Sequence, residues 1–165
     1  MTYPRWTGTY TLSPQGCVMR RRILRRLPVP TFQFVNSESD PLTLWLSADE
    51  WRRPFRRFDG FDFGSVPLAL QGVVSPLAAD KAFALHDSCY EFRAWWTPRG
   101  REDCTRKEAD DLLRIGMRAQ GCGWWIANKA WFAVRIVGGG VWRKDFSAAT
   151  NLCRAIMAAE FPEGT

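Results

Sequence analysis

The chain has 165 residues, which is the size of one domain and enough to bury a single hydrophobic core. Hydrophobic residues make up 46% of it, with nine tryptophans among them, and this composition excludes an intrinsically disordered chain. Lysine and arginine number 23 against 17 acidic residues, and the net charge of +6 is compatible with an anionic partner without requiring one.

The first 70 residues are predicted to form strands and loops. Residues 30–35 (PTFQFV) and 42–47 (LTLWLS) are short alternating or aromatic runs, and the polar residues between them favour a turn. A further short strand is expected within residues 53–61. Residues 20–27 (RRRILRRL) form a cationic patch, which we interpret as an exposed strand whose arginines lie in solvent. Its apolar residues, expected to reach the core, are Ile23, Leu24 and Leu27.

Helical periodicity begins near residue 77. The first predicted helix covers residues 75–96 and ends before the sequence TPRG. The second opens at Thr105, which forms a capping box with Glu108. Apolar residues that recur at helical spacing define a buried stripe on this second helix: Ala109, Leu112, Leu113, Gly116 and Met117.

Two further helices are predicted in the last third of the chain. Residues 124–137 (WWIANKAWFAVRIV) are apolar on nearly every face, so this helix is expected to be central and to end at the glycines of residues 138–140. An amphipathic helix is predicted over residues 146–160. We therefore predict an α+β fold in one domain, residues 1–165. A small β-rich N-terminal part (1–70) would pack on a mainly helical C-terminal part of four helices (71–165).

The cysteines and the apolar runs bear on the cellular compartment. Five cysteines without a CxxC pair argue against a complete disulfide framework and against a zinc site, so free thiols are expected. The N-terminal residues 1–16 lack the apolar region of a signal peptide, and no run approaches the ~20 apolar residues of a membrane span. We expect a soluble protein without a transmembrane segment, made and folded in the cytoplasm.

The single histidine lies in the first predicted helix. His86 and Tyr90 are four residues apart, so they lie one turn apart on the same face of that helix. Asp87 is rotated by about 100° from His86, and we expect each of these neighbours to take a separate partner. Such a separation fits a site in which one residue acts as a base and the other binds a metal.

The second predicted helix supplies a partner for the histidine. Asp110 borders the buried stripe, whereas Asp111 lies on the basic, solvated face. If the two helices pack antiparallel, Asp110 accepts a hydrogen bond from His86 and fixes its tautomer, which leaves the other ring nitrogen to take a proton from water. Tyr90 would donate to the same carboxylate. The alternative is a buried network that only sets the helix register.

Residues 58–67 (FDGFDFGSVP) form a predicted loop rich in aspartate and glycine. Asp62 and Ser65 are placed to orient a ligand, while Gly60 and Gly64 let backbone carbonyls turn toward a cation. A tight crossover from the sheet to the helices, without a ligand, is the favoured alternative.

Four motifs occur in a fixed order along the chain. They are residues 62–67 (DFGSVP), 86–90 (HDSCY), 106–110 (RKEAD) and 133–138 (AVRIVG). With them the chain resembles, over residues 58–140, a small bacteriophage and prophage family of unknown function (domain of unknown function 1353). The resemblance implies a phage or prophage origin and brings no established activity.

Residues 86–90 (HDSCY) and an aspartate on a neighbouring helix also resemble the His-Asp helix pair of secreted phospholipase A2. This resemblance implies that His86 activates the attacking water, that Asp110 orients His86, and that Tyr90 supports Asp110.

The same resemblance implies calcium as a cofactor. Asp87 would bind the ion, and the stretch from Gly60 through Asp62 to Gly64 would take the place of the calcium loop.

Three classes of function follow. We favour a phage-encoded structural or accessory protein of the tail, head or injection apparatus, with other virion proteins as partners. It would lie in the host cytoplasm during assembly and then in the virion. The second class is a calcium-dependent lipid or ester hydrolase, which a virion can also carry. The third is a basic nucleic-acid-binding accessory that uses residues 20–27 and 53–57, although no recognition motif supports it beyond charge.

Overall fold

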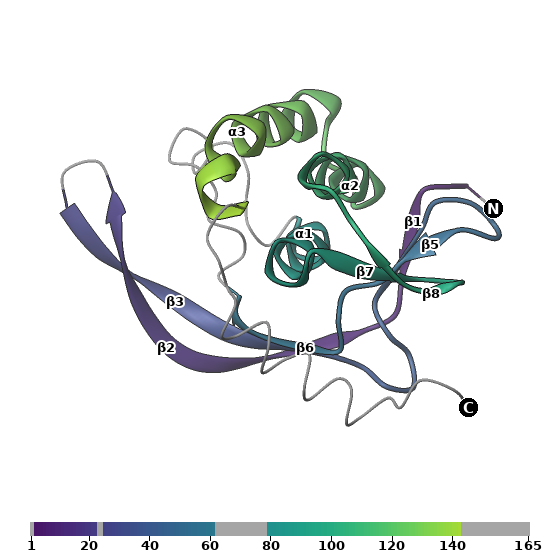
Figure 1. Ribbon diagram of the computed structural model, residues 1–165, viewed down its shortest axis with the longest axis horizontal. Coiled ribbons are helices and arrows are strands. Elements are labelled where there is room, and N and C mark those ends of the chain that lie inside the picture. The colour runs from purple at the N-terminus through teal and green to yellow at the C-terminus, as the bar shows by residue number, and fades with distance from the viewer. Residues whose placement is uncertain (1, 23–24, 62–78, 143–165) are drawn as a thin grey trace.

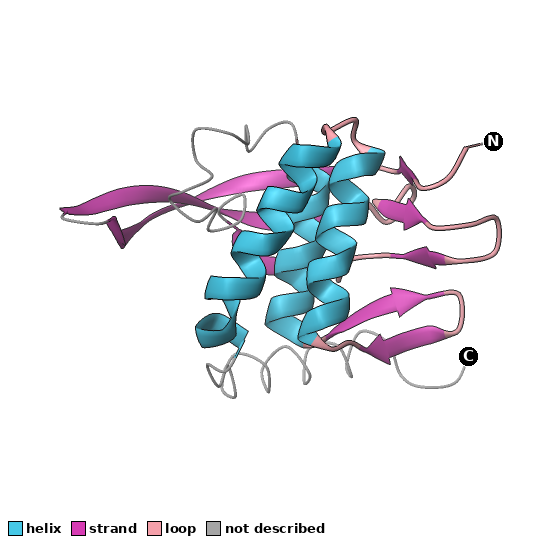
Figure 2. Ribbon diagram, turned by 90° about the horizontal axis from the view of Figure 1, so that it is seen from above, coloured by secondary structure: helices cyan, strands magenta, loops and turns pink. Residues whose placement is uncertain are grey.

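The computed structural model describes residues 2–22, 25–61 and 79–142, and it has the expected α+β class. The helices lie together on one side of the strands, and one strand pair extends well beyond them (Figures 1 and 2). None of the described helices is long and apolar enough to cross a membrane. The cysteines whose side chains are described, at positions 89, 104 and 122, are free thiols, as expected.

The described strands form three antiparallel sheets. The first has the order β1-β4-β5, from Arg5–Thr7, Thr43–Trp45 and Trp51–Arg52. The second has the order β2-β3-β6, from Tyr10–Arg22, Arg25–Asn36 and Arg57–Phe61. The third is the hairpin of β7 (Ala94–Thr97) and β8 (Gly100–Asp103). The predicted strands 30–35 and 42–47 therefore belong to different sheets and do not pair with each other.

Three described helices pack in sequence order. α2 (Arg106–Ala119) lies between α1 (Asp80–Phe92) and α3 (Trp124–Trp142), and α1 faces the strands (Figure 1). The main core forms where these layers meet, from buried residues that include Phe34, Leu42, Phe83, Leu113 and Met117. The predicted fourth helix, residues 146–160, lies outside the described residues.

The start of α2 confirms the capping box. The Thr105 hydroxyl accepts a hydrogen bond from the Glu108 amide at 3.3 Å, and the Glu108 carboxylate accepts one from the Thr105 amide at 2.7 Å. Two of the amides at the helix start that have no partner within the helix are thereby satisfied. The predicted apolar stripe of this helix is buried at all five positions.

The first helix is shorter than predicted. α1 ends at Phe92 because Arg93 adopts a left-handed conformation, with φ of 57°. The chain then enters β7, and the backbone of Trp96 pairs with that of Arg53. Aromatic residues favour strands when they pack against neighbouring strands, and this tertiary pairing overrides the helical pattern.

The position and the end of the third helix also differ from the prediction. α3 is the outermost described helix, and Trp125 and Phe132 on it are 72% and 60% exposed. It continues through the three glycines to Trp142. A Cβ at Gly138 would lie 2.5 Å from the Tyr90 hydroxyl oxygen, and one at Gly139 would lie 2.5 Å from Nη1 of Arg106. The glycines therefore allow close helix packing rather than ending the helix.

The basic stretch of residues 20–27 is not a single strand. β2 ends at Arg22 and β3 begins at Arg25, and these two residues are opposite each other in the register. Residues 20–22 and 25–27 are thus paired in a long strand pair that projects from the body of the molecule (Figures 1 and 2). Ile23 and Leu24 lie outside the described residues, and so does the core contact predicted for them.

Gly8 gives a test of how closely the chain before β2 packs against the backbone of Pro41. Its φ is +83°, and a Cβ there would lie 2.1 Å from the carbonyl oxygen of Pro41. Gly121 has a nearly identical φ of +86° with nothing within 4 Å of its Cβ position, so it is a matched control. We expect Gly121→Ala to lower the free energy of unfolding by about 1–2 kcal/mol through backbone strain. Gly8→Ala should lower it further because a backbone carbonyl must also move. Urea denaturation measures both, and equal losses would contradict the contact.

Candidate functional site

The two helices that carry the predicted site residues pack antiparallel, as the site requires. Gly116, late in α2, lies against Ala82, early in α1, because a Cβ on Gly116 would be 3.0 Å from that of Ala82. At the other end of the contact, Tyr90 of α1 reaches Asp110 of α2. Each step forward along α1 is therefore a step backward along α2, which brings His86 opposite Asp110.

Asp110 is the centre of the cluster and is wholly inaccessible to solvent. Its Oδ1 accepts hydrogen bonds from the Tyr90 hydroxyl at 2.7 Å and from Nε2 of His86 at 3.2 Å. Its Oδ2 faces Nη1 of Arg135 at 3.1 Å and Nε of Arg106 at 3.6 Å. Both carboxylate oxygens are thus compensated by charge or by hydrogen bonds, which a buried carboxylate needs.

His86 is 6% exposed, and its ring centroid lies 4.3 Å from that of Tyr90. Its second nitrogen, Nδ1, lies 3.5 Å from Oδ1 of Asp87. The expectation that His86 and Asp87 would not pair with each other is therefore wrong. Although the two side chains leave the helix in different directions, the carboxylate turns back toward the ring. The contact is longer than an ordinary hydrogen bond, so it is mainly electrostatic.

The two partners of the central pair shift each other's pKa in opposite directions. Burial lowers the pKa of His86, but the hydrogen bond to Asp110, the contact with Asp87 and the charges of both carboxylates outweigh burial and raise it above its ordinary value. Burial raises the pKa of Asp110, and the hydrogen bonds from His86 and Tyr90 outweigh it and lower that pKa. Burial and the Asp110 carboxylate raise the pKa of the Tyr90 phenol. Tyr90 therefore stays a neutral donor.

The neighbouring aspartate, Asp111, lies outside the Asp110 cluster and forms the predicted ion pair with Lys107, but it also contacts α3 and is only 23% exposed, so its face is not fully solvated. Asp111 Oδ2 accepts from Lys107 Nζ at 2.8 Å, and its Oδ1 accepts from the Trp131 indole, also at 2.8 Å. Arg114 lies 3.8 Å from the same carboxylate. The distinction between an inward Asp110 and an outward Asp111 is confirmed.

Two residues of the cluster were not among the predicted site residues. Arg106 precedes Asp110 by four residues on the same helix face, a spacing at which ion pairs form. Arg135 is one of only two cationic residues in the apolar segment of residues 124–137. A charge in such a segment is a signal that it has a specific partner, but the sequence does not show which partner.

The predicted calcium ligands are not brought together by the part of the chain that is described. Gly60 belongs to strand β6 rather than to a loop, because β6 extends the sheet along β3 to Phe61. Asp62, Gly64 and Ser65 lie outside the described residues. Within residues 2–22, 25–61 and 79–142 no group of three acidic, cysteine or histidine residues is placed to hold a metal. Calcium takes about six to eight oxygen ligands, and Asp87 with the other described residues does not provide such a set.

One family model matches the chain. Residues 54–134 match the family described as "Protein of unknown function (DUF1353)". The matched region contains His86, Tyr90 and Asp110 with the two helices that carry them. No curated protein and no solved structure matches the chain. The match supports the resemblance to this family of unknown function, while its phage origin and the likeness to phospholipase A2 stay proposals.

The opposite pKa shifts of His86 and Asp110 predict how stability depends on pH. The raised pKa of His86 contributes stability that is fully present below its ordinary pKa of about 6.5 and is lost as pH rises through the folded value. The lowered pKa of Asp110 contributes stability that is present above its ordinary value and is lost as pH falls through the folded value.

Because His86 is the only histidine, its ring resonances can be followed by NMR without assignment mutants. We expect a titration midpoint above 6.5 in the native protein. Asp110→Asn should lower it, because the negative charge that favours the protonated ring is lost. Asp111→Asn, the matched control, should leave the midpoint in place. A midpoint at or below the ordinary value in the native protein would contradict the ion pair.

Proposed function

We propose that the protein is a phage-encoded accessory protein that hydrolyses an ester bond, with phospholipids as its substrate class. His86, Asp110 and Tyr90 would form its catalytic centre. The observation that supports this most directly is that one oxygen of a fully buried Asp110 accepts from both His86 Nε2 and Tyr90. A base whose ring is held in one orientation by a carboxylate is the usual arrangement for activating water.

In this proposal the two nitrogens of His86 have different roles. An ionised carboxylate can only accept hydrogen bonds, so Nε2 carries a proton toward Asp110. In the neutral ring the basic lone pair is then on Nδ1. That nitrogen faces Asp87, whose side chain is 23% exposed, so this side of the ring is the nearer one to solvent.

The proposed reaction is an acyl transfer to water. A water molecule gives a proton to Nδ1 of His86 while its oxygen attacks the ester carbonyl carbon, and a tetrahedral intermediate forms. When the bond to the alcohol breaks, the same proton passes from Nδ1 to the leaving oxygen, and the products are a carboxylic acid and an alcohol. Asp110 takes no proton in this sequence. It is a positioning residue, which Arg135 and Arg106 help to keep ionised.

Calcium enters the proposal only as a cofactor near Asp87. The described residues do not form a complete site for it, so no step is assigned to the ion. The enzyme assay therefore needs both a calcium arm and a chelator arm.

Fatty-acid release from phosphatidylglycerol vesicles tests the hydrolase. His86→Ala should lower the rate by about 10²-fold or more, the contribution typical of a general base, while circular dichroism shows a retained fold. Asp110→Asn should also lower the rate, and the pH at which the rate rises should shift downward with the His86 pKa. Asp111→Asn should behave as the native protein does. If the folded native protein releases no fatty acid with either calcium or chelator, the proposal fails.

A second candidate function, a structural role in the phage particle, is favoured by the outer surface. α3 exposes four large apolar side chains, at positions 124, 125, 132 and 136, between 56% and 72% exposed. The β2–β3 hairpin also projects away from the body (Figure 2). Exposed apolar faces of this kind are typical of surfaces that pack against other proteins. We propose other virion proteins as the partners. A particle protein can also carry the hydrolase.

Mass spectrometry of gradient-purified particles tests this second candidate. The protein should sediment with particles at a constant ratio to the major capsid protein after a high-salt wash, because apolar contacts do not weaken with salt. Phe132→Asp, which places a charge in the exposed face of α3, should release it from particles. Asp49→Lys, an exposed charge reversal between β4 and β5 and away from α3, is the control. Absence of the native protein from washed particles would rule the role out.

A further inference from the structure

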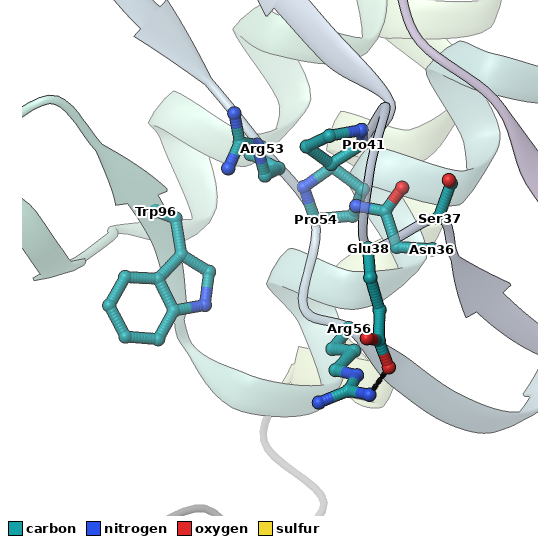
Figure 3. Close-up of a pocket in the computed structure, with 8 residues that line it drawn as sticks. All are labelled: Asn36, Ser37, Glu38, Pro41, Arg53, Pro54, Arg56 and Trp96. Carbon is teal, nitrogen blue, oxygen red and sulfur yellow. Dashed lines mark ion pairs between the residues drawn. The ribbon is translucent and has the colours of Figure 1, made fainter. Parts of the chain in front are cut away.

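A pocket of about 360 Å³ lies on the strand side of the molecule, and neither His86 nor Asp110 lines it. Figure 3 shows Trp96 and Arg53 on one side of this pocket and Asn36 with the Glu38–Arg56 ion pair on the other. Its volume falls in the range of pockets for small ligands. The residues that line it are Asn36, Ser37, Glu38, Pro41, Arg53, Pro54, Arg56 and Trp96.

Arg53 is a half-buried cation without a carboxylate partner in the described part of the chain. Its Nε donates to the Thr43 hydroxyl at 3.1 Å, and its guanidinium lies 4.5 Å from the ring centroid of Trp51. These contacts orient the group without neutralising its charge. Burial lowers the pKa of Arg53, which is the effect of a desolvated cation that lacks an anion. The terminal nitrogens are therefore available to a ligand with a negative charge.

Asn36 adds a second donor to the same pocket. The residue is only 3% exposed, and its Oδ1 accepts a hydrogen bond from the Leu42 amide at 2.7 Å. That bond identifies which side-chain atom is the oxygen, so the other is the amide nitrogen, Nδ2. Nδ2 has no acceptor among the described residues. Nδ2 is not wholly buried, so it is open to the pocket and can donate a hydrogen bond to a ligand there.

The lining also has an apolar part, beside the polar Ser37 and the Glu38–Arg56 ion pair. The Trp96 indole and the rings of Pro41 and Pro54 line the pocket beside the donors. Two backbone hydrogen bonds, at 3.0 and 3.1 Å, join Arg53 and Trp96, so the two residues that supply the cation and the indole are fixed to each other through their backbones. A surface of this kind favours a planar ring over a bare ion, because an indole stacks on aromatic bases.

We propose that this pocket binds a nucleotide unit, with its phosphate on Arg53 and Asn36 and its base against Trp96. The site is separate from the proposed hydrolase, and either can hold without the other. A free mononucleotide and a nucleotide within single-stranded nucleic acid present the same chemistry, so the experiment distinguishes these two sources.

NMR titration of the full-length protein tests the pocket, followed at the Trp96 indole and the Asn36 side-chain amide. The probes are AMP, adenosine, inorganic phosphate and a single-stranded DNA octamer. AMP should bind more tightly than adenosine or phosphate alone, because the pocket recognises both parts. Octamer binding that is tighter than AMP binding would indicate nucleic acid as the source, and comparable binding would indicate a free nucleotide. Failure of AMP and of the octamer to shift these resonances at millimolar concentration would overturn the proposal.

Two variants and a control locate the binding. Arg53→Gln should weaken AMP binding by about tenfold or more, the value of a charge-assisted hydrogen bond. Asn36→Asp keeps the acceptor for the Leu42 amide but repels phosphate, so it tests the pocket even if Arg53→Gln does not fold. Lys129→Gln removes one exposed charge from α3 and should bind as the native protein does. If Arg53→Gln and Asn36→Asp bind AMP with the same affinity as the native protein and the control, the assignment of the site to this pocket is wrong.

Discussion

The described helices depend on one buried carboxylate. Asp110 is inaccessible to solvent, and an ionised group in such a place is strongly destabilising unless its charge is compensated. The compensation comes from both neighbouring helices: His86 and Tyr90 on α1, and Arg135 on α3. A single side chain of α2 thus sets how the helices on either side lie against it. Loss of one partner would leave the buried charge less well compensated and so lower the stability of the helix packing.

Gly138 and Gly139 of α3 leave room for two side chains of this same cluster. Gly138 lies where any larger residue would collide with the Tyr90 hydroxyl, the group that donates to Asp110. Gly139 leaves room for Arg106, which also faces that carboxylate. The close approach of α3 is therefore a condition for burying the site. Glycine is a poor helix former, so these residues lower the intrinsic stability of α3. The packing of α3 against the cluster compensates for that loss.

Two regions with different chemistry lie on this small molecule. The helix cluster holds a histidine whose Nε2 faces a carboxylate, which suits proton transfer. The strand-side pocket holds donors and a flat aromatic wall, which suits an anion attached to a ring. One hydrogen bond connects the two regions. Ser88 of α1 accepts it from the amide of Phe55, which lies next to the pocket in the sequence. This hydrogen bond joins the segment of residues 53–56, which lines the pocket, to the helix that carries His86.

For α1 and α2, helical spacing in the sequence was enough to predict which residues face the partner helix. The capping box, the buried stripe of α2 and the inward position of Asp110 follow from helical spacing, which is a local property. The tertiary structure alone decided the partners: Arg135 on Asp110, Tyr90 beside Gly138, Trp96 paired with Arg53. It also made residues 94–97 a strand and placed the most apolar helix outermost. Local periodicity carries no information on how distant segments approach each other, and that approach depends on the packing of the whole chain.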